Sequence, residues 1–167
     1  MNQLKSYSIT GIVFVLVLGT LSHFFYEWSD NNFIVGLFAP VSESPWEHMK
    51  LLFFPMLLYS LFAIPLLKDS FPCVISAYSA GILLGTLSIP AIFYTYTGIL
   101  GYNLLALDIG TFVLSVLIAF YSVYRLSLSN RIQNHSSILC AAVCLLGISF
   151  MIFSYLPPGI ALFKSSK

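Results

Sequence analysis

Five long runs of apolar residues dominate this chain and limit what it can fold into. A helix crosses the hydrocarbon core of a bilayer with about 20 apolar residues, and each run is of that order of length. The runs cover residues 7–28, 45–67, 71–93, 103–126 and 137–155. Only 8% of the residues are charged, against about a quarter in soluble domains, so a water-facing surface cannot be assembled. The sequence predicts an all-α fold: one membrane domain, residues 1–167, with about five transmembrane helices in the lipid bilayer.

Charge, cysteine content and the lack of known motifs argue against several classes of function. The net charge is +1 without a basic run, which argues against nucleic acid as a partner. Cys73, Cys140 and Cys144 fall within apolar runs, where a cysteine usually serves as a small apolar side chain. No nucleotide-binding loop, haem attachment sequence or nucleophile elbow is present, so ATP-driven, redox and serine-hydrolase functions have no local support.

The ends of two apolar runs carry informative signals. The first run continues into aromatic residues up to Trp28 without a small-residue cleavage site, so we expect a retained helix instead of a signal peptide. The second begins with Ser44-Pro45-Trp46-Glu47, which predicts a capping box with Ser44 as N-cap and Glu47 at the third helical position.

The connecting segments are expected at the membrane surface. Residues 33–38 are predicted to dip into the headgroups, and 94–102 to form a short re-entrant or interfacial connection. Residues 159–167 are predicted to lie along the surface with Lys164 and Lys167 in water. Lys50 is expected to extend toward the interface, and Tyr94 and Tyr96 to join an aromatic belt.

Small residues recur at four-residue spacing in the third run. Ala77, Gly81 and Gly85 would share one helix face and allow close approach of another helix. This stripe predicts a packing face, either within the chain or across a homo-oligomer.

The short basic loops indicate an orientation in the cell membrane. With the N-terminus in the cytoplasm, Lys5, Lys68, Arg125 and Arg131 all face the cytoplasm, in accord with the positive-inside rule. The first and third connections then face outward.

Most acidic residues collect at one membrane face under this topology. The first predicted helix ends there, and the second and fourth begin there. Five of the six acids belong to this face, together with two histidines. They are Glu27, Asp30, Glu43, Glu47, Asp108, His23 and His48. Because an ionisable group within the apolar depth costs free energy unless it is paired or hydrated, this face is the candidate functional site.

Each of these residues also has a structural interpretation. His23 and Glu27, four residues apart, form either a structural pair or part of a joint site for a metal or proton. Glu47 is accounted for by the capping box, and Glu43 is expected to be solvated near the helix N-terminus. His48 has no capping role, although it could extend to the interface.

Asp108 is the most informative acid, because it lies one to two turns inside a predicted helix. Its candidate partners are His23 and His48 at matching depth, which gives a speculative divalent-metal site of His23, His48 and Asp108. The alternative is a polar contact that holds helices together.

From His23 the chain reads HFFYEWS and, from Phe38, FAPVSESPWEHMKL. This stretch resembles a family of small bacterial multi-pass membrane proteins of unknown function, whose signature is roughly H-F-x-Y-x-W-S and F-x-P-V-N-E-S-x-W-E-H-x-K-L. Ser42 stands where the signature has asparagine. The segments at 94–98 and 107–109 are also similar to that family. The resemblance implies a fold and matching candidate positions, but no activity: His23, Glu27, Glu43, Trp46, Glu47, His48 and Asp108.

Three functions from different classes follow. The first is binding or transport of a proton or divalent cation by the polar cluster. The second is a metal-dependent intramembrane hydrolase acting on a lipid-linked substrate, with Glu47 or Glu27 as base, although no complete ligand motif supports it. The third is a non-catalytic accessory or assembly subunit.

Overall fold

The computed structural model describes residues 2–129 and 131–165, and all regular structure in this part of the chain is helical. The helices are α1 (Asn2–Trp28), α2 (Phe33–Phe38), α3 (Pro45–Leu67), α4 (Val74–Leu100), α5 (Leu105–Ser129) and α6 (Ser136–Phe153), with 3-10 turns η1 (Gln133–His135) and η2 (Ala161–Phe163). Among the described residues, five helices are long and apolar enough to cross a membrane. The all-α prediction is confirmed.

The start of α3 coincides with its prediction because its N-cap works as expected. The Ser44 side chain accepts a hydrogen bond from the Glu47 backbone N–H at 3.4 Å, and Pro45 occupies the first helical turn. Proline is tolerated there because the first N–H groups of a helix have no intrahelical partner.

The prediction of a separate re-entrant or interfacial connection over residues 94–102 is wrong, because α4 continues through this segment to Leu100. An uninterrupted helix keeps backbone hydrogen bonds satisfied within the segment, which an apolar environment favours. The helix stops at Gly101, which adopts φ 79° and donates its N–H to the Thr97 carbonyl at 2.8 Å. This left-handed helix end suits glycine.

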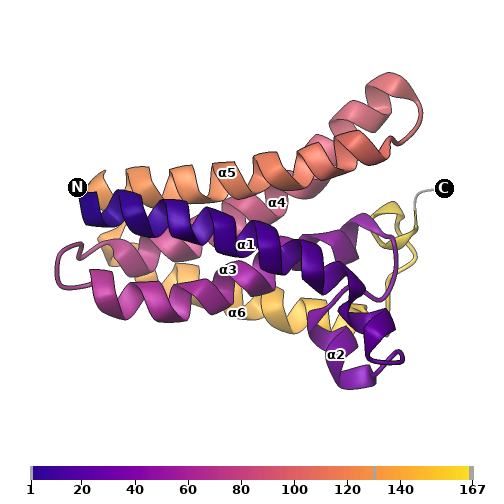
Figure 1. Ribbon diagram of the computed structural model, residues 1–167, viewed down its shortest axis with the longest axis horizontal. Coiled ribbons are helices and arrows are strands. Elements are labelled where there is room, and N and C mark those ends of the chain that lie inside the picture. The colour runs from indigo at the N-terminus through magenta and orange to yellow at the C-terminus, as the bar shows by residue number, and fades with distance from the viewer. Residues whose placement is uncertain (1, 130, 166–167) are drawn as a thin grey trace.

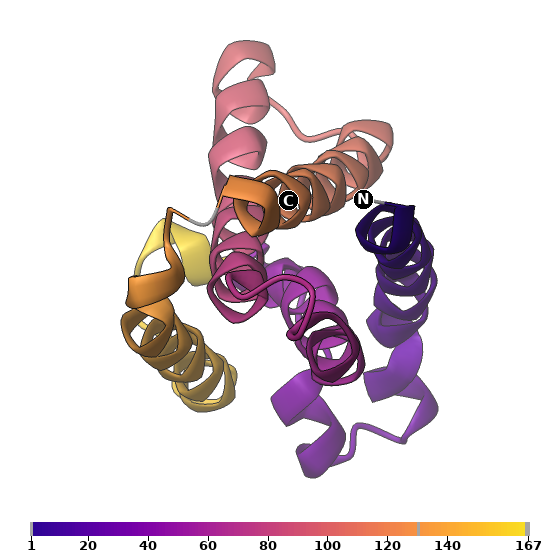
Figure 2. The same cartoon turned by 90° about the vertical axis from the view of Figure 1, so that its left-hand side faces the viewer.

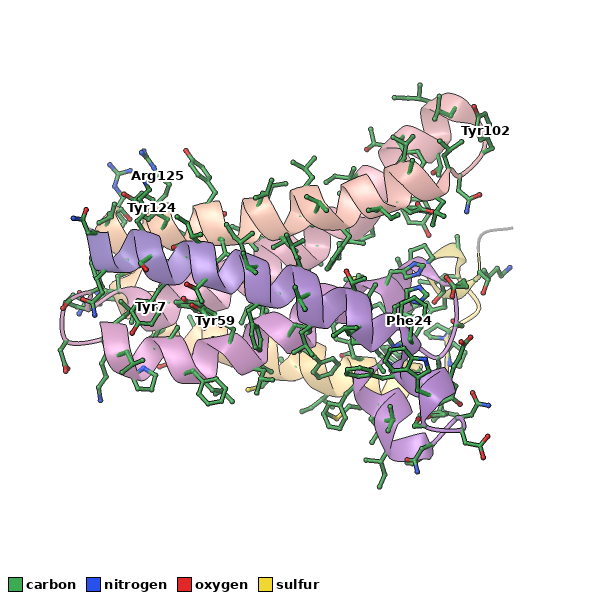
Figure 3. All side chains as sticks on the ribbon, viewed as in Figure 1. Tyr7, Phe24, Tyr59, Tyr102, Tyr124 and Arg125 are labelled. Atoms are coloured by element: carbon green, nitrogen blue, oxygen red, sulfur yellow. The ribbon has the colours of Figure 1, made fainter. Side chains whose placement is uncertain are left out.

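The central pair of the bundle is α3 and α4, with α1 and α6 on opposite sides of it (Figure 2). Helix α5 packs along α4 and also contacts α1 (Figure 1). Aromatic side chains fill the interior, and on the α1–α3 side the Tyr59 hydroxyl donates to the Tyr7 carbonyl at 2.6 Å (Figure 3). Because each of the five long helices, α1, α3, α4, α5 and α6, contributes apolar residues to this interior, they form one continuous core.

The small-residue stripe of α4 faces α5 of the same chain. A Cβ added at Gly81 would lie 2.9 Å from the Ala119 carbonyl oxygen, and one at Gly85 would lie 2.5 Å from the Ala119 Cβ. Ala77 is fully buried. The stripe therefore serves close packing within the chain, and a homo-oligomer through Ala77, Gly81 and Gly85 stays a prediction.

One end of the bundle gathers the segments that carry the candidate site. The C-terminal ends of α1, α4 and α6 and the N-terminal ends of α3 and α5 meet there, with α2 beside them (Figure 1). The α4–α5 hairpin, marked by Tyr102, extends beyond the other helices at this end, whereas Arg125 lies at the opposite end (Figure 3). The predicted relative topology of the polar face is therefore present.

The C-terminal segment departs from the expected surface tail. Phe163 packs its ring against Trp46, with centroids 4.7 Å apart, and also contacts Phe153. An aromatic residue can join the core at a helix end even where its segment is too short to cross the bundle. Lys164 is exposed as expected, and Lys167 lies outside the described residues.

Candidate functional site

His23 and His48 lie side by side although they come from different helices. His23 is near the C-terminal end of α1 and His48 is in the first turn of α3, and these two ends meet. Their rings are stacked, with centroids 5.5 Å apart and planes inclined by 25°. The two imidazoles are therefore neighbours, while their depth in a membrane stays a prediction.

Glu43 completes a cluster with these two histidines. Its Oε2 lies 3.1 Å from His48 Nε2 and 3.6 Å from His23 Nε2. One ligand atom from each of the three side chains falls within 4.8 Å of the others. The linker after α2 brings Glu43 back across the end of α1. Glu43 is therefore not merely a solvated acid near a helix end, although its side chain is 65% exposed.

The first two turns of α3 direct their polar side chains to two different sites. His48 faces α1, whereas Glu47 and Lys50 face α2 and α6, because adjacent residues on a helix point about 100° apart. This division separates the histidine cluster from a second, buried polar group.

Lys50 does not extend to the interface, so that prediction is wrong. Its side chain is 0% exposed, and Nζ lies 2.8 Å from Glu47 Oε2 while donating to the carbonyls of Gly36 and Ala39 at 2.9 and 3.2 Å. A lysine has three N–H donors, and these three acceptors match them. Burial is tolerated because the charge is fully paired.

Glu47 fulfils only half of the expected capping box. Its backbone N–H donates to Ser44, but its carboxylate accepts from the Val41 N–H at 3.0 Å and the Ser154 hydroxyl at 2.8 Å. The linker folds back over α3, so the carboxylate meets Val41, while Lys50 draws it into the interior. Glu47 therefore joins three segments, the linker, α3 and the end of α6.

These contacts position the linker that carries Glu43. We call Glu47, Lys50, Ser154 and the backbone groups that they bind the latch. Beside it, the Tyr155 hydroxyl donates to the Phe33 carbonyl at 3.0 Å. Two effects raise the pKa of Tyr155: mainly its desolvation, and to a lesser extent the nearby Tyr26 phenol. The Tyr155 hydroxyl therefore stays a neutral hydrogen-bond donor. The latch and Tyr155 together hold α2 and the linker against the helix ends.

Asp108 is paired with Tyr96 instead of a histidine. The Tyr96 hydroxyl donates to Asp108 Oδ1 across the α4–α5 pair. Tyr96 is available because α4 continues beyond the predicted end at residue 93. Its place in an aromatic belt stays a prediction. Among the described residues, the group of three side chains close enough to hold a metal ion contains Glu43 in the place expected for Asp108.

Asp108 nevertheless lines the same cleft as the cluster. This cleft has a volume of about 340 Å³ and lies among α1, α3, α4 and α5. Its polar lining includes His23, Glu43, His48 and Asp108, and most of the remaining lining is apolar. The predicted gathering of these residues therefore occurs around a shared space and not in one ligand set.

Two predicted residues lie apart from the cluster. Glu27 is exposed, and His23 approaches Glu43 in place of the expected pair with Glu27, with His23 Nε2 3.6 Å from Glu43 Oε2. Trp46 is buried, with its ring 4.6 Å from that of Phe150 by centroids, which gives it a packing role.

A family model covers residues 1–167 of this chain, the whole sequence. The chain belongs to DUF6512, a family of unknown function. No curated protein matches the chain, and no solved structure does. The family assignment agrees with the expected membership of a family of unknown function and adds no activity.

Three residues of this DUF6512 chain were missed as parts of the site: Lys50, Tyr96 and Ser154. The spacing of Glu47 and Lys50, three residues apart on one helix, was a usable signal for an ion pair. Tyr96 could have been found only by extending α4. Ser154 carries no local signal, because its contact with Glu47 depends on how α6 packs.

Proposed function

We propose that this protein is a multi-pass membrane protein that binds a divalent cation through His23, Glu43 and His48. The observation that carries the proposal is the convergence of two imidazoles and one carboxylate from three segments onto one point. Two nitrogens and one oxygen suit Zn²⁺ and related transition metals.

The spacing of the ligand atoms supports this proposal. Ligands about 2.0–2.1 Å from a tetrahedral zinc lie about 3.3 Å from one another. The distances from Glu43 Oε2 to the two histidine nitrogens, 3.1 and 3.6 Å, bracket that value. A cation could therefore be accommodated with small side-chain movements.

The partial exposure of the cluster also supports the proposal. Three protein ligands leave a fourth coordination position for water or another ligand, as in open metal sites. The cluster borders the 340 Å³ cleft, so this position would face a space and not packed side chains.

The test is metal analysis of protein purified in a non-ionic detergent without chelators. We expect near-stoichiometric zinc or manganese in the wild type, and at least about tenfold less in His48→Ala and Glu43→Gln, because each loses a ligand. His135→Ala is the matched imidazole control, since His135 is exposed in η1 and outside the cluster. Glu27→Gln is the matched carboxylate control at the same end of the bundle.

Two results would contradict the proposal. Metal-free wild type, also after incubation with zinc or manganese, would favour the accessory-subunit alternative. Equal metal loss in the control variants would show that the metal binds elsewhere.

A further inference from the structure

The cleft beside the histidine cluster combines a polar end with apolar walls. Four helices supply the walls, and the apolar side chains include Leu51 of α3, Ile89 and Phe93 of α4, and Phe112 of α5. The lining residues with ionisable side chains are His23, Glu43, His48 and Asp108. Such a division matches a ligand with one polar head and one apolar body.

The rim of the cleft is apolar on the outer side of the bundle. Leu105 and Ile109 of α5 and Phe24 of α1 line the cleft and are themselves exposed, Leu105 by 75%. Leu105, Asp108, Ile109 and Phe112 share one face of α5 because they lie three or four residues apart. In a bilayer, this rim would contact lipid chains, so a ligand could move from the membrane into the cleft sideways.

We propose that the cleft binds a single-chain amphiphile from the bilayer, whose anionic oxygen head group ligates the cation held by His23, Glu43 and His48. The inference rests on the proposed function, since the cation supplies the contact for the head group. The chain of the amphiphile lies against the apolar walls between α1 and α5.

The volume and charge of the cleft argue for this occupant. A volume of about 340 Å³ is near the lower end of the roughly 300–1,000 Å³ found for ligand pockets, which suits one chain better than a two-chain lipid. No lysine or arginine is among the described residues that line the cleft. An anionic head would therefore be held at the cation, because no lysine or arginine of this lining competes for it.

The test uses Mn²⁺-loaded protein in non-ionic detergent and the broadening of NMR signals by the paramagnetic ion. The probes are dodecyl phosphate, inorganic phosphate and dodecanoate labelled with ¹³C at the carboxylate. We expect at least about tenfold stronger broadening for a dodecyl probe than for inorganic phosphate at equal concentration, because the chain adds apolar contacts. The two dodecyl probes distinguish a phosphate head from a carboxylate head.

A cleft-filling variant separates this inference from metal binding. Ile109→Trp places a larger side chain in the cleft from a position that is 56% exposed, so the core of the bundle is not disturbed. It should keep its manganese and reduce broadening of the dodecyl probe about tenfold, since the chain is excluded. Ile148→Trp is the matched control, because Ile148 is 53% exposed on α6 and does not line the cleft.

The outcomes are distinct for the two proposals. Wild type without bound manganese or zinc overturns the proposed function, and the amphiphile inference with it. Bound manganese with equal broadening by dodecyl and inorganic phosphate overturns the amphiphile inference alone. So does an unchanged dodecyl signal in Ile109→Trp, or an equal loss in Ile148→Trp.

Discussion

His23 and His48 stack their imidazole rings 5.5 Å apart, and a single carboxylate oxygen of Glu43 lies within 3.6 Å of a nitrogen of each. Each of the three residues comes from a different segment: α1, the linker and α3. The cluster therefore exists only when these segments are docked, so changes in the docking should affect metal binding as well as stability.

The ligand set can be tested by exchanging one candidate ligand at a time. Asp108→Asn should retain the metal content of the wild type, because Asp108 pairs with Tyr96 and lies outside the three-residue group. His23→Ala should lower the metal content at least about tenfold. Metal analysis of both variants checks this, and loss of metal in Asp108→Asn would instead support the ligand set His23, His48 and Asp108.

Lys50→Met should destabilise the protein by about 3 kcal/mol, because it leaves the Glu47 carboxylate buried without its cation. Glu47→Gln combined with Lys50→Met should be less destabilised than the sum of the single variants, with a coupling of about 1–3 kcal/mol. Denaturant unfolding in detergent measures both quantities. If the losses of stability in the two single variants simply add up in the double variant, the Glu47–Lys50 ion pair does not stabilise this part of the protein.

The same Lys50→Met variant should weaken metal binding about 10- to 100-fold, since the latch positions the linker that carries Glu43. A zinc titration of metal-depleted protein, at a temperature at which the variant is still folded, measures its affinity for zinc. Unchanged affinity would mean that Glu43 reaches the histidines without the latch.

Gly85→Val should destabilise the bundle by about 1–3 kcal/mol, because its side chain would meet Ala119 and the Ser115 carbonyl of α5. Gly110→Val is the matched control, since an added Cβ there has no atom within 4 Å. Thermal unfolding in detergent compares the two. If the control loses as much stability as Gly85→Val, the close packing of α4 and α5 is not the cause.

The predicted orientation places the cluster on the outer side of the membrane. In a variant without the native cysteines, Lys164→Cys should react with a membrane-impermeant maleimide in intact cells, and Asp69→Cys only after permeabilisation. Both positions are exposed, and they lie at opposite ends of the bundle. The reverse labelling pattern would place the N-terminus outside.

Local physical signals determined much of this fold in advance. Hydropathy located the five long helices, since each must satisfy its own backbone and present an apolar surface. The Ser44 cap placed the start of α3, and the alternation of helix directions brought His23, His48 and Asp108 to one end. These features depend on residues close together in the sequence.

The partners of the polar side chains were decided only by tertiary structure. The sequence does not tell how far the linker folds back, so the roles of Glu43 and Lys50 were missed. It also does not tell that α4 continues far enough for Tyr96 to reach Asp108. The physical reason is that a polar side chain in an apolar surrounding takes the nearest available partner. The rotation and docking of whole helices determine which partner is nearest.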